Sequence, residues 1–95
     1  MTVSLEAPVL AGSRPRAQKL LADLPDNLTG SIVELHCELL IAAAASFADE
    51  IIRELLVKRH AEQLVVSGVS DQEFVGYLRD RADVHGVTDR LQVLS

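Results

Sequence analysis

LLIAAAASFADEIIRELL covers residues 39–56, and its one serine, Ser46, decides between two folds. A stretch so rich in Ala and Leu, with no Gly or Pro, could form one long buried helix. However, the Ser46 hydroxyl can accept from the free N–H groups at a helix start, and Asp49 lies three residues on, as in a capping box. We therefore predict that a helix begins at Ser46 and that a strand or loop precedes it.

The charges around this stretch favour the same boundary. Asp49 and Glu50 would lie at the positive end of the helix dipole, and the basic run at 58–60 would lie at its negative end. We predict a helix over residues 46–60, with Phe47 packing at its start. Its apolar stripe consists of Ala48, Ile51, Ile52, Leu55 and Leu56.

The segment before this helix has the period of a strand. In SIVELHCELL, residues 31–40, polar and apolar residues alternate. One face would carry Ile32, Glu34, His36 and Glu38, and the other Val33, Leu35, Cys37 and Leu39. Further upstream we expect a short strand around Val3 and Leu5. A helix should follow Ser13, with Pro15 in its first turn and its end near Pro25.

The same plan repeats downstream. EQLVVSGV, residues 62–69, predicts a buried strand, and Ser70 with Glu73 predicts a capping box that opens a helix ending at His85 and Gly86. Residues 87–95 either add an edge strand or form a tail. This alternation predicts one α/β domain over residues 1–95, with a small mostly parallel or mixed sheet and about three helices.

Composition and charge exclude several classes of partner. The formal net charge of −5 disfavours binding to nucleic acid or to anionic lipid. The longest uncharged run has ten residues, about half of the ~20 that cross a bilayer. The first residues lack the pattern of a signal peptide. With Cys37 as the one cysteine, we expect a cytoplasmic protein with no membrane partner.

Two residues near the helix starts could form a functional corner. Ser46 either caps its helix or accepts a phosphate, since a helix N-terminus stabilises a dianion. Asp49 and Glu50 would repel that phosphate. Arg14 either pairs with Asp49 or Glu50 on the surface or forms an anion-binding corner beside Ser46.

No catalytic, metal or cofactor site is expected. His36 and Cys37 are adjacent on the predicted strand, so they point to opposite faces and cannot share a metal ion. The chain has no Cys-x-x-Cys pair, no Gly-rich phosphate loop and no Gly-x-Ser-x-Gly motif. We therefore expect a protein that is not an enzyme.

SFADE at 46–50 resembles a motif of the STAS-like domain family of bacteria. GSRPRAQKLLADLP at 12–25, LVVSGVS at 64–70 and GVTDRLQV at 86–93 resemble further parts of that family, so that the likeness covers roughly residues 9–94. The chain departs from the family in two places. His36 and Cys37 stand where the family has Asp-Phe, and four alanines replace small polar residues before the serine.

The resemblance implies a STAS-like fold and a regulatory protein–protein interaction module. The family is similar to anti-sigma-factor antagonists, which bind an ATP-using kinase and are switched by phosphorylation at a helix N-terminus. Ser46 occupies a comparable place. The partner, such as a kinase-type ATPase, would meet the start of the helix, with Phe47 as anchor and the acids Asp49 and Glu50 around it.

Two alternatives remain open. One is a small phosphate-handling or hydrolytic enzyme that uses Arg14, Ser46 and Asp49. The other is a structural domain that forms a homodimer or larger oligomer. An exposed Phe47 would favour the binding module, a concave pocket joining Arg14 to Ser46 would favour the enzyme, and a large apolar symmetric interface would favour the oligomer.

Overall fold

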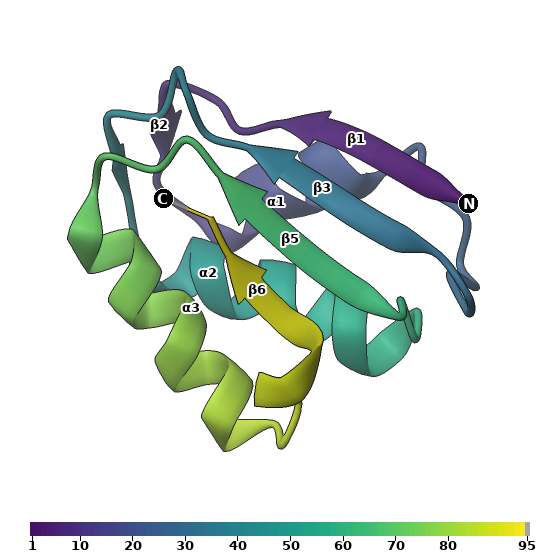
Figure 1. Cartoon of the computed structure of the whole chain (residues 1–95). Coiled ribbons are helices and arrows are strands. Elements are labelled where there is room, and N and C mark those ends of the chain that lie inside the picture. Colours follow the sequence, from purple (N-terminus) through teal and green to yellow (C-terminus); the bar gives the residue numbers. More distant parts are fainter. Residues whose placement is uncertain (95) are drawn as a thin grey trace.

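Four parallel strands form the main sheet of the computed structural model, which describes residues 1–94. The strands lie side by side in the order β1, β3, β5, β6 (Figure 1). Their bounds are β1 Thr2–Glu6, β3 Ile32–His36, β5 Gln63–Ser67 and β6 Leu91–Val93. The register aligns Val3 with Val33 and Leu35 with Val66. Each strand of this sheet thus pairs with the strand of the same sheet that precedes it along the chain.

The helices connect these strands and cover one face of the sheet. They are α1 Arg14–Leu21, α2 Ala45–Ile52 and α3 Gln72–Val84. A π-helix, η1 Arg53–Lys58, continues α2, and a short 3₁₀ turn, η2 Thr88–Arg90, precedes β6. Right-handed crossovers between consecutive parallel strands place every connection on the same side. Figure 1 shows this arrangement, with α1 and α2 behind the sheet.

The core lies between the helices and the covered face of the sheet. Val33, Leu35, Leu64 and Val66 point into it from the strands. The helices contribute the largest buried side chains, which include Leu21, Phe47, Ile51, Ile52, Leu55, Phe74 and Leu78. The opposite face of the sheet carries mainly polar residues, among them Ser4, Glu34, His36 and Ser67. That polarity allows this face to remain without a helical cover.

A second, two-stranded parallel ladder lies beyond the carboxyl ends of β1 and β3. It pairs β2 Leu10–Ala11 with β4 Ala42–Ala43. Ile41 N–H donates to the Val9 carbonyl at 2.9 Å, and Ala44 N–H donates to the Ala11 carbonyl at 2.8 Å. These bonds hold the chain extended up to the first residue of α2.

The predicted α/β class and the alternation of strands and helices are confirmed. His85 and Gly86 do end α3, and Gly86 has the positive φ (70°) that favours glycine there. Residues 91–93 form the edge strand β6. Residue 95, the last of the predicted tail segment, lies outside the described residues.

Three predicted boundaries were wrong. The β3 strand ends at His36, so Leu39 lies in the following turn and is exposed. The first helix ends at Leu21, earlier than the expected end near Pro25. Asp71, not Ser70, caps α3 and accepts a hydrogen bond from the Glu73 N–H at 3.1 Å. An ionised carboxylate at this position also interacts favourably with the helix dipole.

Two arginines satisfy backbone carbonyls where helices end. The Arg59 guanidinium donates to the Leu21 carbonyl at 3.0 Å and to the Leu24 carbonyl at 3.2 Å. Arg90 donates to the Leu56 carbonyl at 2.9 Å and also to the Ala61 carbonyl. Carbonyls at a helix end have no partner within the helix, so these side chains take that role.

We expect Arg90→Ala to lower the free energy of unfolding by about 1–3 kcal/mol, because it leaves two half-buried carbonyls without a donor. Urea denaturation measures this loss. Arg79→Ala is the matched control, since it removes an exposed arginine and should change stability by no more than about 0.5 kcal/mol. Equal losses in the two variants would show that Arg90 has no special structural role.

Candidate functional site

The starts of α1 and α2 meet the middle of α3 around a pocket of about 350 Å³. Three of the predicted site residues, Arg14, Ser46 and Asp49, line this pocket together. Its complete lining is Arg14, Ala45, Ser46, Asp49, Tyr77, Asp80 and Arg81. The feature expected of the enzyme alternative, a concave pocket joining Arg14 to Ser46, is therefore present.

The start of α2 differs from the prediction. Ala44 is the N-cap residue, with φ −83° and ψ 157°, and no side chain caps the helix. Ser46 is the second residue of the helix, so its assignment as the cap was wrong. The reason lies in the β2–β4 ladder, because the bond from Ala44 N–H to the Ala11 carbonyl fixes the last extended residue at 44.

Phe47 is fully buried, which contradicts its expected role as an exposed anchor. Its ring packs against Phe74 of α3, with ring centroids 6.0 Å apart. Helical spacing places Phe47 on the same face as Ile51, four residues later, and that face meets the core. The Glu50 side chain is only 1% exposed. Neither side chain is accessible to a partner in this conformation.

A network of ion pairs surrounds the two acidic residues of α2. Glu50 accepts hydrogen bonds from Arg53 at 2.5 Å, from Gln18 at 2.9 Å and from Arg14 at 3.4 Å. Asp49 accepts from Arg14 at 2.6 Å, and its Oδ1 lies 3.2 Å from the Nε2 of His85. The expectation that Arg14 pairs with Asp49 or Glu50 is confirmed. The network connects all three helices.

These contacts keep both carboxyl groups ionised. Burial opposes ionisation of Asp49, but hydrogen bonds from Arg14 and His85 outweigh it, and the pKa of Asp49 is lowered. Burial opposes ionisation of Glu50 as well, and the bonds from Gln18 and Arg53 again lower its pKa. The hydrogen bond with Asp49 raises the pKa of Arg14. Asp49 therefore acts as a fixed counter-ion and is poorly suited to donate a proton.

The other polar side chains of the pocket come from α3. The Arg81 guanidinium bonds Asp80 at 2.8 Å and approaches Asp49 at 3.9 Å, and the Tyr77 hydroxyl donates to Glu73 at 3.3 Å. Tyr77, Arg81 and His85 were not among the site residues predicted from the sequence. A signal was present, because these three residues recur every four positions and so share one helical face.

The side chains of His36 and Cys37 point in opposite directions, as predicted, but Cys37 lies just beyond the end of β3. Cys37 is buried, and burial raises the pKa of its thiol to about 12. His36 lies on the uncovered face, where its Nδ1 is 3.2 Å from the Ser67 hydroxyl. Within residues 1–94, no three His, Cys, Asp or Glu side chains are grouped so that they could hold a metal ion. None of the helices described is long and apolar enough to span a membrane.

Comparisons of this chain with protein-family models, with curated proteins and with solved structures found no match. The STAS-like resemblance therefore stays a prediction that rests on the residues quoted for it.

Serine at position 44 should supply the cap that α2 lacks. We expect Ala44→Ser to raise the free energy of unfolding by about 0.5–1 kcal/mol, because its hydroxyl can accept from a free N–H of the first turn. Ser46→Ala should change stability by less than about 0.5 kcal/mol. Urea denaturation of both variants measures these effects. A loss of about 1 kcal/mol in Ser46→Ala would instead identify Ser46 as the cap.

The lowered pKa values of Asp49 and Glu50 predict acid sensitivity. Below the ordinary carboxyl pKa the unfolded chain takes up protons that the folded protein still excludes. The stability from these groups is therefore present at neutral pH and decreases as the pH falls below about 5. We expect Glu50→Gln to lower stability at neutral pH and to flatten this dependence, as measured by urea denaturation at several pH values. Glu62→Gln, at an exposed position outside the network, is the control. If the free energy of unfolding of Glu50→Gln fell with pH as steeply as that of Glu62→Gln, Glu50 would not be a source of the acid sensitivity.

Proposed function

We propose that this chain is a regulatory protein-binding module that contacts its partner through an apolar corner beside the start of α2. The corner consists of Val9, Leu10, Leu39 and Ile41, each between 47% and 68% exposed. These are half of the eight large apolar residues that are exposed in the described part of the chain. Such a concentration of exposed apolar side chains is typical of a protein–protein contact.

The β2–β4 ladder brings the members of the corner together. Val9 and Ile41 are joined by a backbone hydrogen bond, and Leu10 pairs with Ala42 in the ladder. From Ile41 the chain runs through β4 into α2, so four residues separate this member of the corner from Ser46 in the pocket lining. Figure 1 shows β2 and the neighbouring strand at one end of the molecule, above the helices. Because Phe47 is buried, the residues proposed to anchor the partner are those of the apolar corner before α2.

Ser46 is the proposed switch. Its side chain is partly exposed in the first turn of α2, and Arg14 and Arg81 line the same pocket. A phosphate on Ser46 would gain from the helix dipole and from the two guanidinium groups. Asp49 and Asp80 would repel it. Two added negative charges beside the apolar corner would disfavour an apolar contact there, so phosphorylation is proposed to release the partner.

The kinase-type ATPase remains the proposed partner because of the STAS-like resemblance. An enzyme of this kind would both bind the corner and phosphorylate Ser46. The corner and the pocket lie close enough on the chain, at residues 39–46, for one protein to contact both.

The hydrolytic alternative is supported by the pocket that joins Arg14 to Ser46. A serine nucleophile needs a base within hydrogen-bond reach. In residues 1–94 no hydrogen bond links Ser46 to a histidine or a carboxylate, and Asp49 is already bonded to Arg14 and His85. Hydrolysis of p-nitrophenyl phosphate that disappears in Ser46→Ala would favour this alternative over the binding module.

A comparison of four baits tests the proposal. Wild type, the double variant Leu39→Lys/Ile41→Lys, Ser46→Glu and the control Val84→Lys are used to capture proteins from the native lysate. Val84 is also an exposed apolar residue, but it lies on the last turn of α3. We expect wild type and the control to retain one partner that the double variant and Ser46→Glu lose.

The purified partner is then incubated with ATP and either wild type or Ser46→Ala, and intact mass is measured. A phosphate added to wild type alone supports the proposed switch. Capture that is equal for all four baits would refute the apolar corner. If wild type sediments as a dimer and the double variant as a monomer, the corner joins two copies and the oligomer alternative replaces the module.

A further inference from the structure

The outer edge of β1 has no strand beside it. Ile32 N–H donates to the Met1 carbonyl, and Ala7 N–H donates to the His36 carbonyl, so the odd-numbered residues of β1 bond β3. In a regular strand the backbone groups alternate in direction. The N–H and C=O groups of Thr2, Ser4 and Glu6 therefore point outward, and within residues 1–94 they have no backbone partner. An unpaired edge of this kind can accept a further strand.

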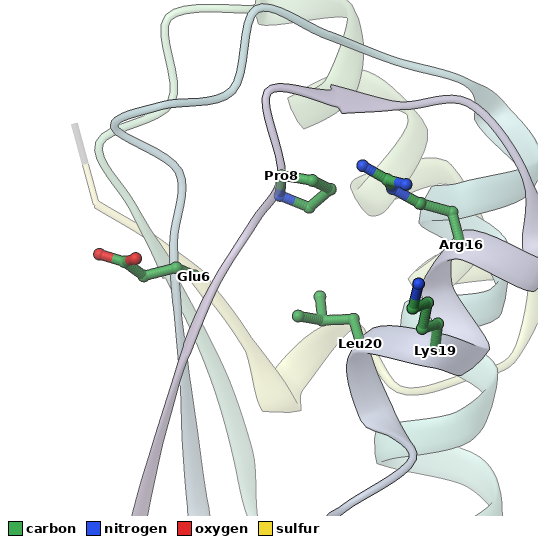
Figure 2. Close-up of a pocket in the computed structure, with 5 residues that line it drawn as sticks. All are labelled: Glu6, Pro8, Arg16, Lys19 and Leu20. Carbon is green, nitrogen blue, oxygen red and sulfur yellow. The ribbon is translucent and has the colours of Figure 1, made fainter.

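A pocket of about 240 Å³ opens beside this edge, between α1 and the chain that leaves β1. Pro8, Arg16, Lys19 and Leu20 border it, together with Glu6. In Figure 2 the side chains of Arg16 and Leu20 extend from α1 toward the β1 side, Lys19 points toward Arg16, and Glu6 points away from α1. The pocket thus combines an apolar floor with two cations, on the side of β1 that faces the helices.

The two cations of this pocket are free to bind an anion. Arg16 and Lys19 are exposed, and no ion pair or side-chain hydrogen bond engages either of them in the described residues. Five of the other basic residues, Arg14, Arg53, Lys58, Arg59 and Arg81, pair with acids of the chain itself. The net charge of −5 opposes anionic ligands over most of the surface, whereas two unpaired cations in one pocket favour an acidic group at this place.

We propose that β1 binds an extended acidic segment of a partner protein as an added strand. Its backbone would pair with Thr2, Ser4 and Glu6. Every second side chain of the segment would face the helices, with an acidic one against Arg16 and Lys19 and an apolar one against Leu20. The side chains between them would lie beside Glu6 on the uncovered face, so they should be neutral.

A second copy of the chain fits this edge less well. Antiparallel pairing of β1 with itself would place both α1 helices on the same side of the joined sheet. The two strands would run in opposite directions, so the pocket at the carboxyl end of each β1 would lie against residues 1–5 of the other copy, which contain no acid to pair with Arg16 and Lys19. An acidic segment instead complements these cations. The edge is separate from the apolar corner, so this interaction goes beyond the proposed function and does not depend on it.

A designed peptide tests the added strand directly. The probe is acetyl-Ser-Val-Thr-Glu-Thr-Val-Ser-amide, which carries Val, Glu and Val on one face and neutral residues on the other. Its control has Lys in place of Glu. Binding to the full chain is followed by NMR, and hydrogen exchange of the Thr2, Ser4 and Glu6 amides is measured. We expect the Glu probe at millimolar concentration to slow exchange at these three amides, and the Lys probe to bind at least about tenfold more weakly.

Variants identify the contacts. Arg16→Glu/Lys19→Glu should reverse the preference between the two probes, and Arg79→Glu, which changes an exposed arginine on α3, should bind them as wild type does. Ser4→Pro removes an outward N–H without touching a backbone bond to β3, and the only other bond that it removes among the described residues is the exposed one from the Ser4 hydroxyl to Glu34. It should abolish probe binding and leave the fold intact, as checked by circular dichroism, whereas Ser4→Ala, which loses the same side-chain bond, should bind the probe.

Three results would overturn the proposal. The first is that the Glu probe does not slow hydrogen exchange at the Thr2, Ser4 and Glu6 amides, and the second is that Ser4→Pro binds the probe as wild type does. The third is that exchange at these amides is already slow without any probe and becomes slower as the protein concentration rises. The last result would identify a second copy as the occupant. Leu39→Lys/Ile41→Lys should bind the Glu probe as wild type does, so failure of the apolar corner and failure of the β1 edge are distinguishable.

Discussion

The buried carboxylate of Glu50 imposes the constraint on which the arrangement of the helices depends. A charge removed from water without partners costs several kcal/mol even after the protein relaxes. The donors that satisfy Glu50 come from α1, through Arg14 and Gln18, and from η1, through Arg53. Asp49 connects the end of α3 to the same network, because it bonds His85, the C-cap residue of that helix. Apolar packing alone would tolerate several relative positions of these helices, whereas the directed bonds to two adjacent carboxylates select one.

This constraint also shapes the proposed site. Arg14 lines the pocket beside Ser46, yet it already pairs with both Asp49 and Glu50. Under the proposed function, a phosphate on Ser46 would compete with these carboxylates for Arg14. Phosphorylation would then act on the contact between α1 and α2 as well as on the local charge. In this way the ion pairs of Arg14, which position the helices, can also convert phosphorylation of Ser46 into a change in the contact between α1 and α2.

Much of the fold was predictable because its signals are local. The period of two in residues 32–37 predicted β3, and the apolar spacing and charges predicted α2 and α3 to within one or two residues at their starts, although both predicted cap residues were wrong. The start of α2 was misplaced because Ala44 is held by a bond to Ala11, more than thirty residues earlier in the chain. Two strands of two residues each leave no periodic pattern, so β2 and β4 could not be recognised from the sequence.

The site was predictable in part for the same reason. Arg14 and Asp49 were paired correctly, since opposite charges at two helix starts attract each other. The burial of Phe47 follows from its spacing to Ile51, because residues four apart share one face of a helix. The contribution of Arg81 and His85 depends on which face of α3 meets α2, and only tertiary packing decides that. A polar face at a spacing of four residues is equally compatible with a solvated surface.

The order of the strands has a consequence for how the chain assembles during synthesis. Each strand of the main sheet pairs with the strand that precedes it in that sheet, β3 with β1, β5 with β3 and β6 with β5. In the main sheet each strand after β1 therefore leaves the ribosome later than the strand it pairs with, whereas β2 in the small ladder has to wait for β4. The main sheet can thus be extended in chain order, and β6 completes it only when the last residues of the domain are available.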